Sequence, residues 1–381
     1  MDGVVERTVD GMPAAPGIWR WASALPETAG HRVTLGEGDT PLVPLPRLGA
    51  RIGLPDLWAK LEQTNPTGSY KDRIAACSLS LALARGDRGW IATSSGNAST
   101  SLVAYGARAG LPGMLLVTPN IPREKLIPSL SGRAHVVKVA GTGTGGSPEA
   151  ASRTFETARA AAAAHRLFLG ITAHAYNPDG MRGADTIGHE LAAAGIAADA
   201  CYVPTGGGGL ATAIGRGLAA AGSAEAVVVA QPSGCAPIAR VLSGDLEEAR
   251  VDRCDTAISG LQLPLPPDGE AAVAAARDSG GWGVAVDDEA ILDAQLLLSR
   301  EEGLLVEPAA ATALAGVVAD RRSGRLDGGA RVVLVLTGSG MKDLATPEAR
   351  LTAPATCEPA QLDDEIAAWL DAAAPAQEAA A

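Results

Sequence analysis

Four short segments of the chain carry side chains or backbone groups that could do chemistry. The first is LEQTNPTGSYKDR, residues 61–73, where a turn signal is followed by Lys71. Ser69 can cap a helix that starts after this turn, which places Lys71 in the first turn of that helix. The helix dipole disfavours a positive charge there and favours a neutral, nucleophilic amine. A solvent-facing lysine beside Asp72 is the alternative that this segment alone leaves open.

The second segment, TSSGNASTS at residues 93–101, lies between a predicted strand and a predicted helix. It offers several hydroxyl groups, one amide and the backbone N–H groups of a helix N-terminus. These donors favour a carboxylate or a phosphate. Ordinary helix capping would need only one of the polar residues, so we predict an anion site in this segment.

The third and fourth segments each follow a predicted strand. PTGGGGLATAIGRG, residues 204–217, places four glycines where a strand turns into a helix. Glycines let the backbone close around a phosphate, and the helix supplies aligned N–H donors; a tight turn is the alternative. VLTGSGMKD, residues 335–343, puts Thr337 and Ser339 at a strand end, where parallel sheets bind ligands. Turn formation alone would also place them there.

Other chemistry has weaker support in the sequence. GTGTGG, residues 141–146, matches a dinucleotide-binding loop, which also needs an acidic residue at the end of the next strand. That strand, predicted over residues 167–172, ends near Thr172, Ala173 and His174, which argues against a nicotinamide cofactor. The five histidines do not cluster, and neither HExxH nor GxSxG occurs. We therefore expect no metal site and no serine hydrolase triad.

Composition limits the partners. The 381 residues carry a formal net charge of −12 and no run rich in Lys and Arg, which argues against nucleic acid. The longest uncharged apolar run, residues 308–319, is too short to cross a bilayer, and the acidic N-terminus does not read as a signal peptide. Five widely spaced cysteines without a CxxC pair favour neither a zinc nor a disulfide framework, and favour a reducing cytoplasm.

The elements that must position these segments follow an alternating pattern. Unbroken runs of Val, Leu and Ile separated by helix-like stretches indicate buried parallel strands. The predicted strands cover residues 90–94, 114–118, 135–140, 167–172, 201–205, 226–231 and 332–338. They form two clusters divided near residue 175. We predict an α/β fold of two lobes, each a mainly parallel sheet flanked by helices, with a cleft between them. Residues 362–374 are predicted to form one short amphipathic helix.

In this order, the segments resemble the fold type II pyridoxal-phosphate enzymes, and most closely the threonine synthases. The resemblance covers residues 17–345. Its motifs are GIWRW, LGEGDTPLVPL, NPTGSYKDR, SSGNASTSLVAYGARAGL, VEPAAATALAG and LTGSGMKD. It implies a cytoplasmic homodimer that uses pyridoxal 5'-phosphate on a small amino-acid substrate. The implied reaction is a carbon–oxygen lyase reaction that converts O-phospho-L-homoserine and water to L-threonine and phosphate.

The resemblance also implies domains and roles for matching residues. Residues 1–67 and 175–350 would form a large cofactor domain, residues 68–174 a small substrate domain, and residues 351–381 an Ala-rich tail. Lys71 would hold the cofactor covalently and move protons, Asn97 would bind the phenolic oxygen of its ring, and Thr337 would face the ring nitrogen. The cofactor phosphate would be bound by Gly206, Gly207, Gly208 and Gly209. The substrate carboxylate would be bound by Ser94, Ser95, Gly96 and Ala98.

Several positions depart from the threonine synthase pattern. Ala98 stands where Thr is common, and the all-glycine loop resembles that of serine and threonine dehydratases. Gly180 and Asp185 stand where Arg and Lys are expected, although a dianionic substrate calls for cations. The alternative is a β-elimination or β-replacement on serine, threonine or an activated serine. A cofactor-binding sensor without turnover is a third hypothesis. Arg182 and Lys125 are candidates to replace the missing cations.

Overall fold

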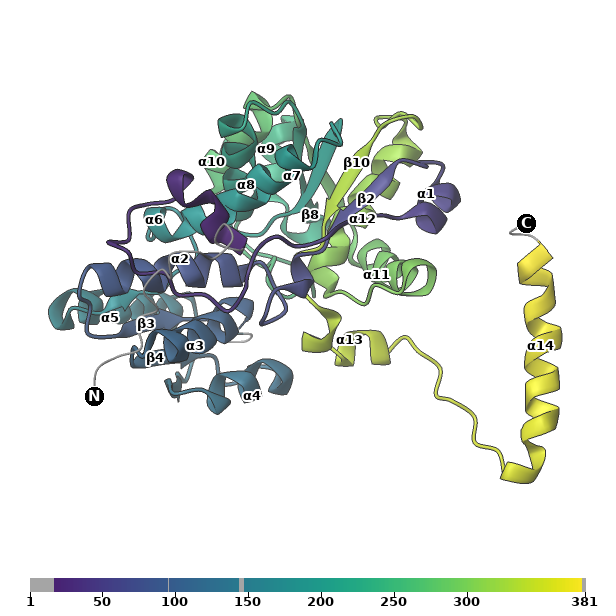
Figure 1. The fold of residues 1–381 in the computed structure, drawn as a ribbon, viewed down its shortest axis with the longest axis horizontal. Helices are drawn as coiled ribbons and strands as arrows, with labels where there is room; N and C mark the ends of the chain where they lie inside the picture. Colours follow the sequence, from purple (N-terminus) through teal and green to yellow (C-terminus); the bar gives the residue numbers. More distant parts are fainter. Residues whose placement is uncertain (1–16, 95, 144–146, 379–381) are drawn as a thin grey trace, which may run out of the picture. The chain divides into compact units, whose positions relative to one another are not determined.

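The computed structural model describes residues 17–94, 96–143 and 147–378. Its contacts divide the chain into a body that ends at Leu344 and a tail that begins at Ala345. Helices and strands alternate along the body and build two separate sheets with helices around them (Figure 1). The α/β class and the two mainly parallel sheets predicted from the sequence are confirmed.

The larger sheet has six strands. In spatial order they are β1 (Leu42–Pro44), β2 (Leu57–Lys60), β10 (Val332–Val335), β7 (Ala200–Pro204), β8 (Ala226–Pro232) and β9 (Gly283–Val286). Only the β1–β2 pair is antiparallel. The smaller sheet is parallel throughout, in the order β5 (His135–Lys138), β4 (Gly113–Val117), β3 (Trp90–Thr93) and β6 (Phe168–Leu169).

Helices cover both faces of each sheet. The α-helices of the body are α1 (Pro46–Ile52), α2 (Lys71–Ala84), α3 (Asn97–Ala109), α4 (Arg123–Ser131), α5 (Pro148–His165), α6 (Pro178–Met181), α7 (Asp185–Ala194), α8 (Gly209–Ala220), α9 (Pro237–Ser243), α10 (Gly269–Asp278), α11 (Asp288–Glu302) and α12 (Pro308–Ser323). The short 3-10 helices are η1 (Gly17–Ala24), η2 (Glu62–Thr64), η3 (Arg182–Ala184), η4 (Ser233–Cys235) and η5 (Gly340–Lys342). Three helices, α1, α11 and α12, contribute to the core on one face of the six-stranded sheet, and α7 to α10 to the core on the other.

The aliphatic strands explain this arrangement. Neighbouring residues of a strand point to opposite faces of its sheet. Val228 packs into the core on the α12 side, whereas Val227 and Val229 pack into the core on the α8 side. All three side chains are fully buried. A strand that is apolar at every position therefore needs helices on both faces, as in buried parallel sheets.

Three expectations about local structure were wrong. Strand β6 has two residues rather than six, because residues 170–176 leave the sheet as a loop. Ser69 does not cap α2: Tyr70 is at the N-cap, and the Ser69 hydroxyl is buried without a partner among the described residues. A disulfide joins Cys235 to Cys254, where the cysteine spacing had argued against a disulfide framework. Pairs of this kind depend on three-dimensional proximity, which spacing does not report.

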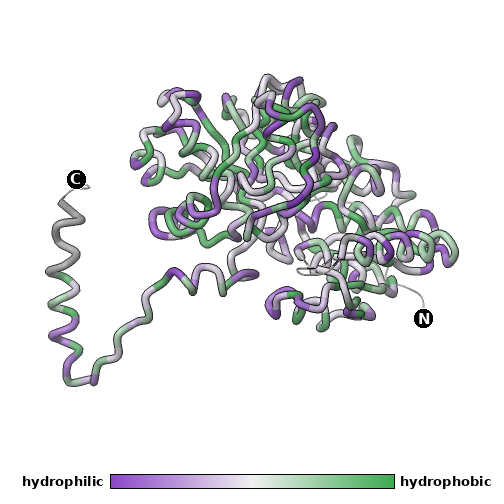
Figure 2. Tube along the Cα trace, turned by 180° about the vertical axis from the view of Figure 1, so that it is seen from behind, coloured by the Kyte–Doolittle hydropathy of each residue, from purple (hydrophilic) through white to green (hydrophobic). Residues whose placement is uncertain are grey.

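The tail contains α13 (Ala345–Glu348), η6 (Pro359–Gln361) and α14 (Leu362–Glu378), which extends the predicted 362–374 helix by one turn. The hydropathy colouring of Figure 2 shows polar and apolar residues mixed along the coloured first part of α14, residues 362–370. Within residues 362–370, the large apolar side chains of Leu362, Ile366, Trp369 and Leu370 are exposed. Over the described residues of the whole chain, no helix has both the length and the apolar character needed to cross a bilayer.

Candidate active site

One cavity of the body, with a volume of about 790 Å³, gathers residues from all four segments that were predicted to do chemistry. Its walls follow the carboxyl ends of strands from both sheets. Residues 96–98 come after β3, residues 170–173 after β6, residues 204–209 after β7, and Thr337 after β10. Ligands of parallel α/β proteins bind at these strand ends. The volume is in the range of small-molecule sites.

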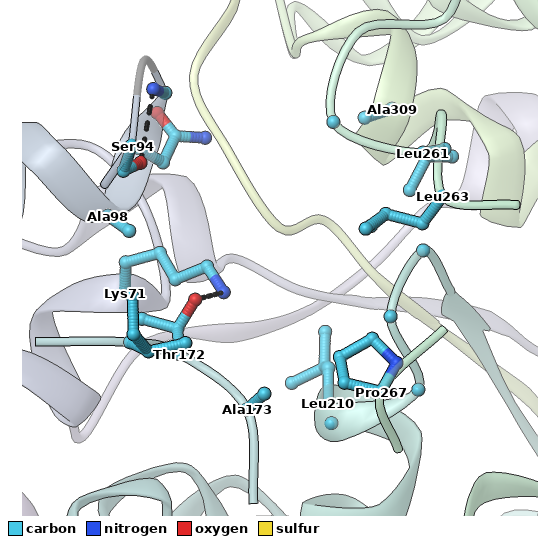
Figure 3. Close-up of a pocket in the computed structure, with 18 of the residues that line it drawn as sticks. Lys71, Ser94, Ala98, Thr172, Ala173, Leu210, Leu261, Leu263, Pro267 and Ala309 are labelled. Carbon is cyan, nitrogen blue, oxygen red and sulfur yellow. Dashed lines mark hydrogen bonds between the residues drawn. The ribbon is translucent and has the colours of Figure 1, made fainter. Parts of the chain in front are cut away.

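Lys71 is the first residue of α2 and lines this cavity. The turn before it is closed by a hydrogen bond from the Gly68 N–H to the Asn65 carbonyl (2.7 Å), with Gly68 at a φ of +80°. Glycine adopts this left-handed conformation without a steric penalty. The Lys71 side-chain nitrogen donates to the Thr172 hydroxyl at 2.9 Å (Figure 3). The same nitrogen lies 4.6 Å from the centre of the Tyr70 ring. The amine is therefore held inside the cavity.

A buried ionic cluster anchors the start of α2. Arg73, two residues after Lys71, is fully buried and binds Glu62 (2.7 Å) and Glu190 (2.5 Å). Glu190 also binds Lys60 at 2.6 Å. Burial raises the pKa of Glu190, but Arg73 and then Lys60 outweigh it and lower that pKa to about 2. The cluster joins α2, η2, β2 and α7, so it fixes the position from which Lys71 enters the cavity.

The predicted anion segment forms another wall. Ser94, Gly96, Asn97 and Ala98 line the cavity, and Ser95 lies outside the described residues. Helix α3 begins at Asn97, and in the described structure no side chain caps its first turn. The Ser94 hydroxyl accepts a hydrogen bond from the Gly96 N–H at 3.4 Å. Uncapped N–H groups at a helix N-terminus can bind an anion, so the anion site in this segment stays a prediction.

The glycine loop after β7 forms the opposite wall. The four glycines that line it are Gly206, Gly207, Gly208 and Gly209. A Cβ atom at Gly206 would lie 2.7 Å from the Gly260 carbonyl oxygen, and one at Gly208 would lie 2.4 Å from the Asp268 carbonyl oxygen. Gly208 also has a φ of +92° and is the N-cap of α8, which has no side-chain cap in the part of the chain described. The glycine loop therefore packs closely against residues 260 and 268, and the first N–H groups of α8 have no side-chain cap in the part of the chain described. These N–H groups suit a phosphate group bound in the cavity.

A fixed loop links the glycine wall to the lysine wall. The Asp268 carboxylate accepts hydrogen bonds from the backbone N–H groups of His174 (2.8 Å) and Ala175 (3.0 Å). The Asp268 N–H donates to the Gly207 carbonyl at 2.9 Å. Burial and then Arg216 lower the pKa of His174, whose ring lies 3.2 Å from the Gly209 carbonyl oxygen. The loop that carries Thr172 is therefore tied to the glycine loop.

Gly180 and Asp185, which stand where cations were expected, do not line the cavity. Asp185 is buried and accepts hydrogen bonds from Arg182 and Arg216, both at 2.6 Å, and none of the three lines the cavity. Gly180 packs against Ser78 and Asn177 at α6, also away from the lining. Lys125 of α4 does line the cavity. It is 6 % exposed, and its ammonium lies 3.1 Å from Glu307.

The two hydroxyl residues after β10 have different surroundings. Thr337 lines the cavity and is nearly buried. Ser339 does not line it; its hydroxyl accepts the Met341 N–H and caps η5. Of the GTGTGG segment, residues 144–146 lie outside the described residues, and residues 141–143 are not part of this cavity.

Several lining residues were not predicted as site residues from the sequence. Thr172 was assigned to a strand, and Glu307 lies in the VEPAAATALAG motif without a predicted role. Leu261, Leu263 and Leu265 belong to a loop in which leucine alternates with other residues, and all three line the cavity together with Pro267. Figure 3 shows Leu261, Leu263 and Pro267 on one side of this cavity. A glutamate directly before the Pro at the first position of a helix could have indicated Glu307, because that position is close to the helix N-terminus.

Known proteins resemble this chain over most of its length. The family model described as "Pyridoxal-phosphate dependent enzyme" matches residues 33–338. A threonine synthase of Methanosarcina acetivorans is 31% identical over 341 residues, which cover 87% of this chain and 81% of that protein. A threonine synthase of Halalkalibacterium halodurans is also 31% identical, over 89% of this chain and 91% of that protein.

Solved structures share the fold. The processed form of threonine deaminase isoform 2 from Solanum lycopersicum superposes with a TM-score of 0.68 at 20% identity, over 81% of this chain and 86% of that chain. Maize serine racemase also superposes with a TM-score of 0.68 at 20% identity, over 87% of this chain and 92% of that chain. At this identity the two structures support the fold alone.

Proposed function

The chain belongs to the family of pyridoxal-phosphate dependent enzymes, and we propose that it converts O-phospho-L-homoserine and water to L-threonine and phosphate. It is a lyase of this family, and its cofactor is pyridoxal phosphate. The observation that carries the proposal is the Lys71 amine, held in a cavity between a glycine loop and an anion-binding loop. The two threonine synthases at 31% identity support the choice of reaction.

The residues present fit the cofactor. The uncapped start of α8 at Gly208 and Gly209 suits a phosphate, and the Lys71 amine suits a covalent link to an aldehyde. Asn97 would donate to the phenolic oxygen of the ring, and Thr337 would face its nitrogen. When bound, pyridoxal phosphate withdraws electrons from the substrate and stabilises negative charge at Cα.

Different groups of the protein would bind the substrate, move protons and exclude water. Ser94 and the N–H groups of residues 96–98 would hold the substrate carboxylate and so orient the Cα–H bond toward Lys71. Lys71 Nζ would remove the Cα proton and then one Cβ proton as phosphate leaves Cγ. A proton would be added at Cγ, water would add its OH at Cβ, and Lys71 would return a proton at Cα. Thr172 would hold the Lys71 amine between these steps. Closure of residues 68–174 over the substrate would exclude water until the phosphate has left.

The test is direct. Purified protein loaded with pyridoxal phosphate is incubated with O-phospho-L-homoserine, and phosphate and threonine are followed together. Equal release of both is expected, and the Lys71→Ala variant is the control. Absence of both products while the cofactor stays bound would contradict this reaction.

A second candidate is a β-elimination or β-replacement on serine, threonine or an activated serine. A specific observation favours it: in the described lining, the two lysines are Lys71 and Lys125, and Lys125 is paired with Glu307. Leu261, Leu263 and Leu265 add an apolar side. A dianionic group would meet little free positive charge there. Formation of a keto acid from L-serine or L-threonine would support this candidate.

Assembly, location and domain division complete the proposal. A homodimer in the cytoplasm is expected from the family resemblance, with residues 1–67 and 175–350 as the large domain and 68–174 as the small one. Sedimentation at the mass of two chains would support the dimer. A single-chain mass at micromolar concentration would contradict it.

A further inference from the structure

Three charged side chains are linked, directly or through one another, to the amide of Asn97. Its nitrogen donates to the Glu307 carboxylate at 2.5 Å, and its oxygen accepts from the Lys342 ammonium at 2.9 Å. Glu307 also lies 3.1 Å from the ammonium of Lys125. Glu307 and Lys125 are 5 % and 6 % exposed, and Lys342 is half-buried. Together, Asn97, Glu307, Lys342 and Lys125 are called the Asn97 cluster here.

The two ionic partners determine which end of the amide points where. A carboxylate can only accept hydrogen bonds, and an ammonium can only donate them. If the oxygen and nitrogen of Asn97 exchanged places, the oxygen would face Glu307 and the NH₂ group would face Lys342. Both contacts would be repulsive. The amide therefore has one allowed orientation, and its nitrogen keeps one further N–H that Glu307 does not use.

The backbone holds Glu307 in place. The Glu307 N–H donates to the Gly338 carbonyl at 3.0 Å, and the Gly340 N–H donates to the Leu305 carbonyl at 3.1 Å. A Cβ atom on Gly338 would lie 2.1 Å from the Glu307 carboxylate and 3.1 Å from the Asn97 nitrogen. The glycine that follows Thr337 thus leaves room for the carboxylate beside the amide.

Opposite charges meet around this contact. Burial lowers the pKa of Lys342, while Glu307 and Asp72 act in the opposite direction. Lys125 supplies a second cation to Glu307. Each charged side chain of the cluster therefore has an oppositely charged group near it: Glu307 lies near both lysines, and Asp72 is a second carboxyl group near Lys342.

We propose that Glu307 and Lys342 are positioning residues that hold the Asn97 amide as a hydrogen-bond donor toward an acceptor oxygen on the cofactor ring. The inference rests on the proposed contact between Asn97 and the ring. Glu307 and Lys342 act through Asn97 and not on the reacting atoms. Lys125 forms an ion pair with Glu307.

The test measures cofactor binding in place of turnover. Apoprotein is titrated with pyridoxal phosphate, and both the Kd and the long-wavelength absorption maximum are recorded. Asn97→Ala is expected to weaken binding and shift the maximum. Glu307→Gln and Lys342→Met should each weaken binding about tenfold and shift the maximum in the same direction, because the loss of one charge-assisted hydrogen bond has this size. Lys342→Arg should restore both values.

The controls separate the possible failures. Lys138→Met removes an exposed lysine of β5 and should change neither value. The double variant Asn97→Ala with Glu307→Gln should bind no more weakly than Asn97→Ala alone. Wild-type Kd and absorption in both Glu307→Gln and Lys342→Met, beside a clear effect of Asn97→Ala, would overturn the inference. If Asn97→Ala changes neither the Kd nor the absorption maximum, the proposed contact between Asn97 and the ring is wrong, and so is the inference that rests on it. If Glu307→Gln fails to fold, Lys342→Met decides.

Discussion

The side-chain nitrogen of Lys71 lies 2.9 Å from the hydroxyl oxygen of Thr172, so the first residue of α2 is joined to the loop that follows β6. These residues lie 101 positions apart in the chain. The contact places the amine in the cavity and gives it one polar partner. Two predictions follow from the two sides of this contact.

Replacement of Lys71 by Ala removes the amine that would hold the cofactor and move the Cα proton. Turnover should fall at least about a thousandfold, within the range of general acid–base catalysis. After borohydride reduction and denaturation, mass spectrometry should find the cofactor attached to the wild-type chain and absent from Lys71→Ala. The exposed Lys138→Ala variant should retain attachment. Cofactor still attached to Lys71→Ala would assign the link to another lysine.

Replacement of Thr172 by Val removes the acceptor and keeps the shape of the side chain. One neutral hydrogen bond is worth about 1 kcal/mol, so kcat should fall by roughly fivefold. Thr172→Ser, which keeps the hydroxyl, should stay close to wild type. Steady-state kinetics with the preferred substrate make the comparison. Equal rates for Thr172→Val and wild type would show that the hydroxyl does not position Lys71.

Gly208 and Gly222 form a matched pair for the glycine loop. Both have a positive φ, +92° and +70°, but only Gly208 has a backbone oxygen 2.4 Å from the place of a Cβ atom; Gly222 has no atom within 4 Å. Gly222→Ala should cost about 1 kcal/mol of stability from backbone strain alone. Gly208→Ala should cost more and should weaken cofactor binding at least about tenfold. Thermal melting and equilibrium titration measure the two effects; similar values for both variants would contradict a specific role of the loop.

Glu190 should make stability depend on pH in the acid range. Its folded pKa is lowered to about 2 from a usual value of 4.5. The folded state therefore holds the ionised form more strongly than the unfolded state does. The stabilisation is complete above about pH 4.5 and is lost as the pH falls toward about 2. Urea unfolding of wild type and Glu190→Gln between pH 5 and 2 should show a smaller decline for the variant.

At neutral pH the same substitution should be costly. Glu190→Gln leaves Arg73 and Lys60 without a full counter-charge, and breaking a buried ion pair costs about 3–5 kcal/mol. Glu247→Gln, at an exposed position, is the control and should change stability little. A parallel pH dependence in wild type and Glu190→Gln would show that other carboxylates carry the acid response.

The disulfide predicts a thiol count. Denatured protein kept free of reductant should react with a thiol reagent at three cysteines, Cys77, Cys201 and Cys357, and at all five after reduction. Cys254→Ser should show one more free thiol than wild type under the first condition, because Cys235 is then released. Five reactive thiols before reduction would mean that the pair is not bonded in the isolated protein.

The sequence by itself determined the elements and the chemical residues. Runs such as CYVPT and VVLVLTG predict buried strands because every position is apolar, and the structure covers both faces of these strands with helices. The segments around Lys71, Asn97, the four glycines and Thr337 could be recognised in the sequence because glycine, hydroxyl, amide and lysine side chains stand together between apolar runs. These segments meet in one cavity since the carboxyl ends of parallel strands lie at one edge of a sheet.

Only the tertiary structure decided the partners of these residues. Thr172 lies beside Lys71 although the two residues are 101 positions apart in the chain. Glu307 and Lys342 contact Asn97 from 210 and 245 positions away. Cys254 is bonded to Cys235, 19 positions earlier. Local periodicity reports which face of an element is apolar and does not report which distant side chain approaches it. The same limit applies to Asp185: its type suggested a cation replaced by an anion, whereas the fold turns it away from the cavity toward Arg182 and Arg216. Contacts of long sequence separation are set by packing, and packing is a property of the whole chain.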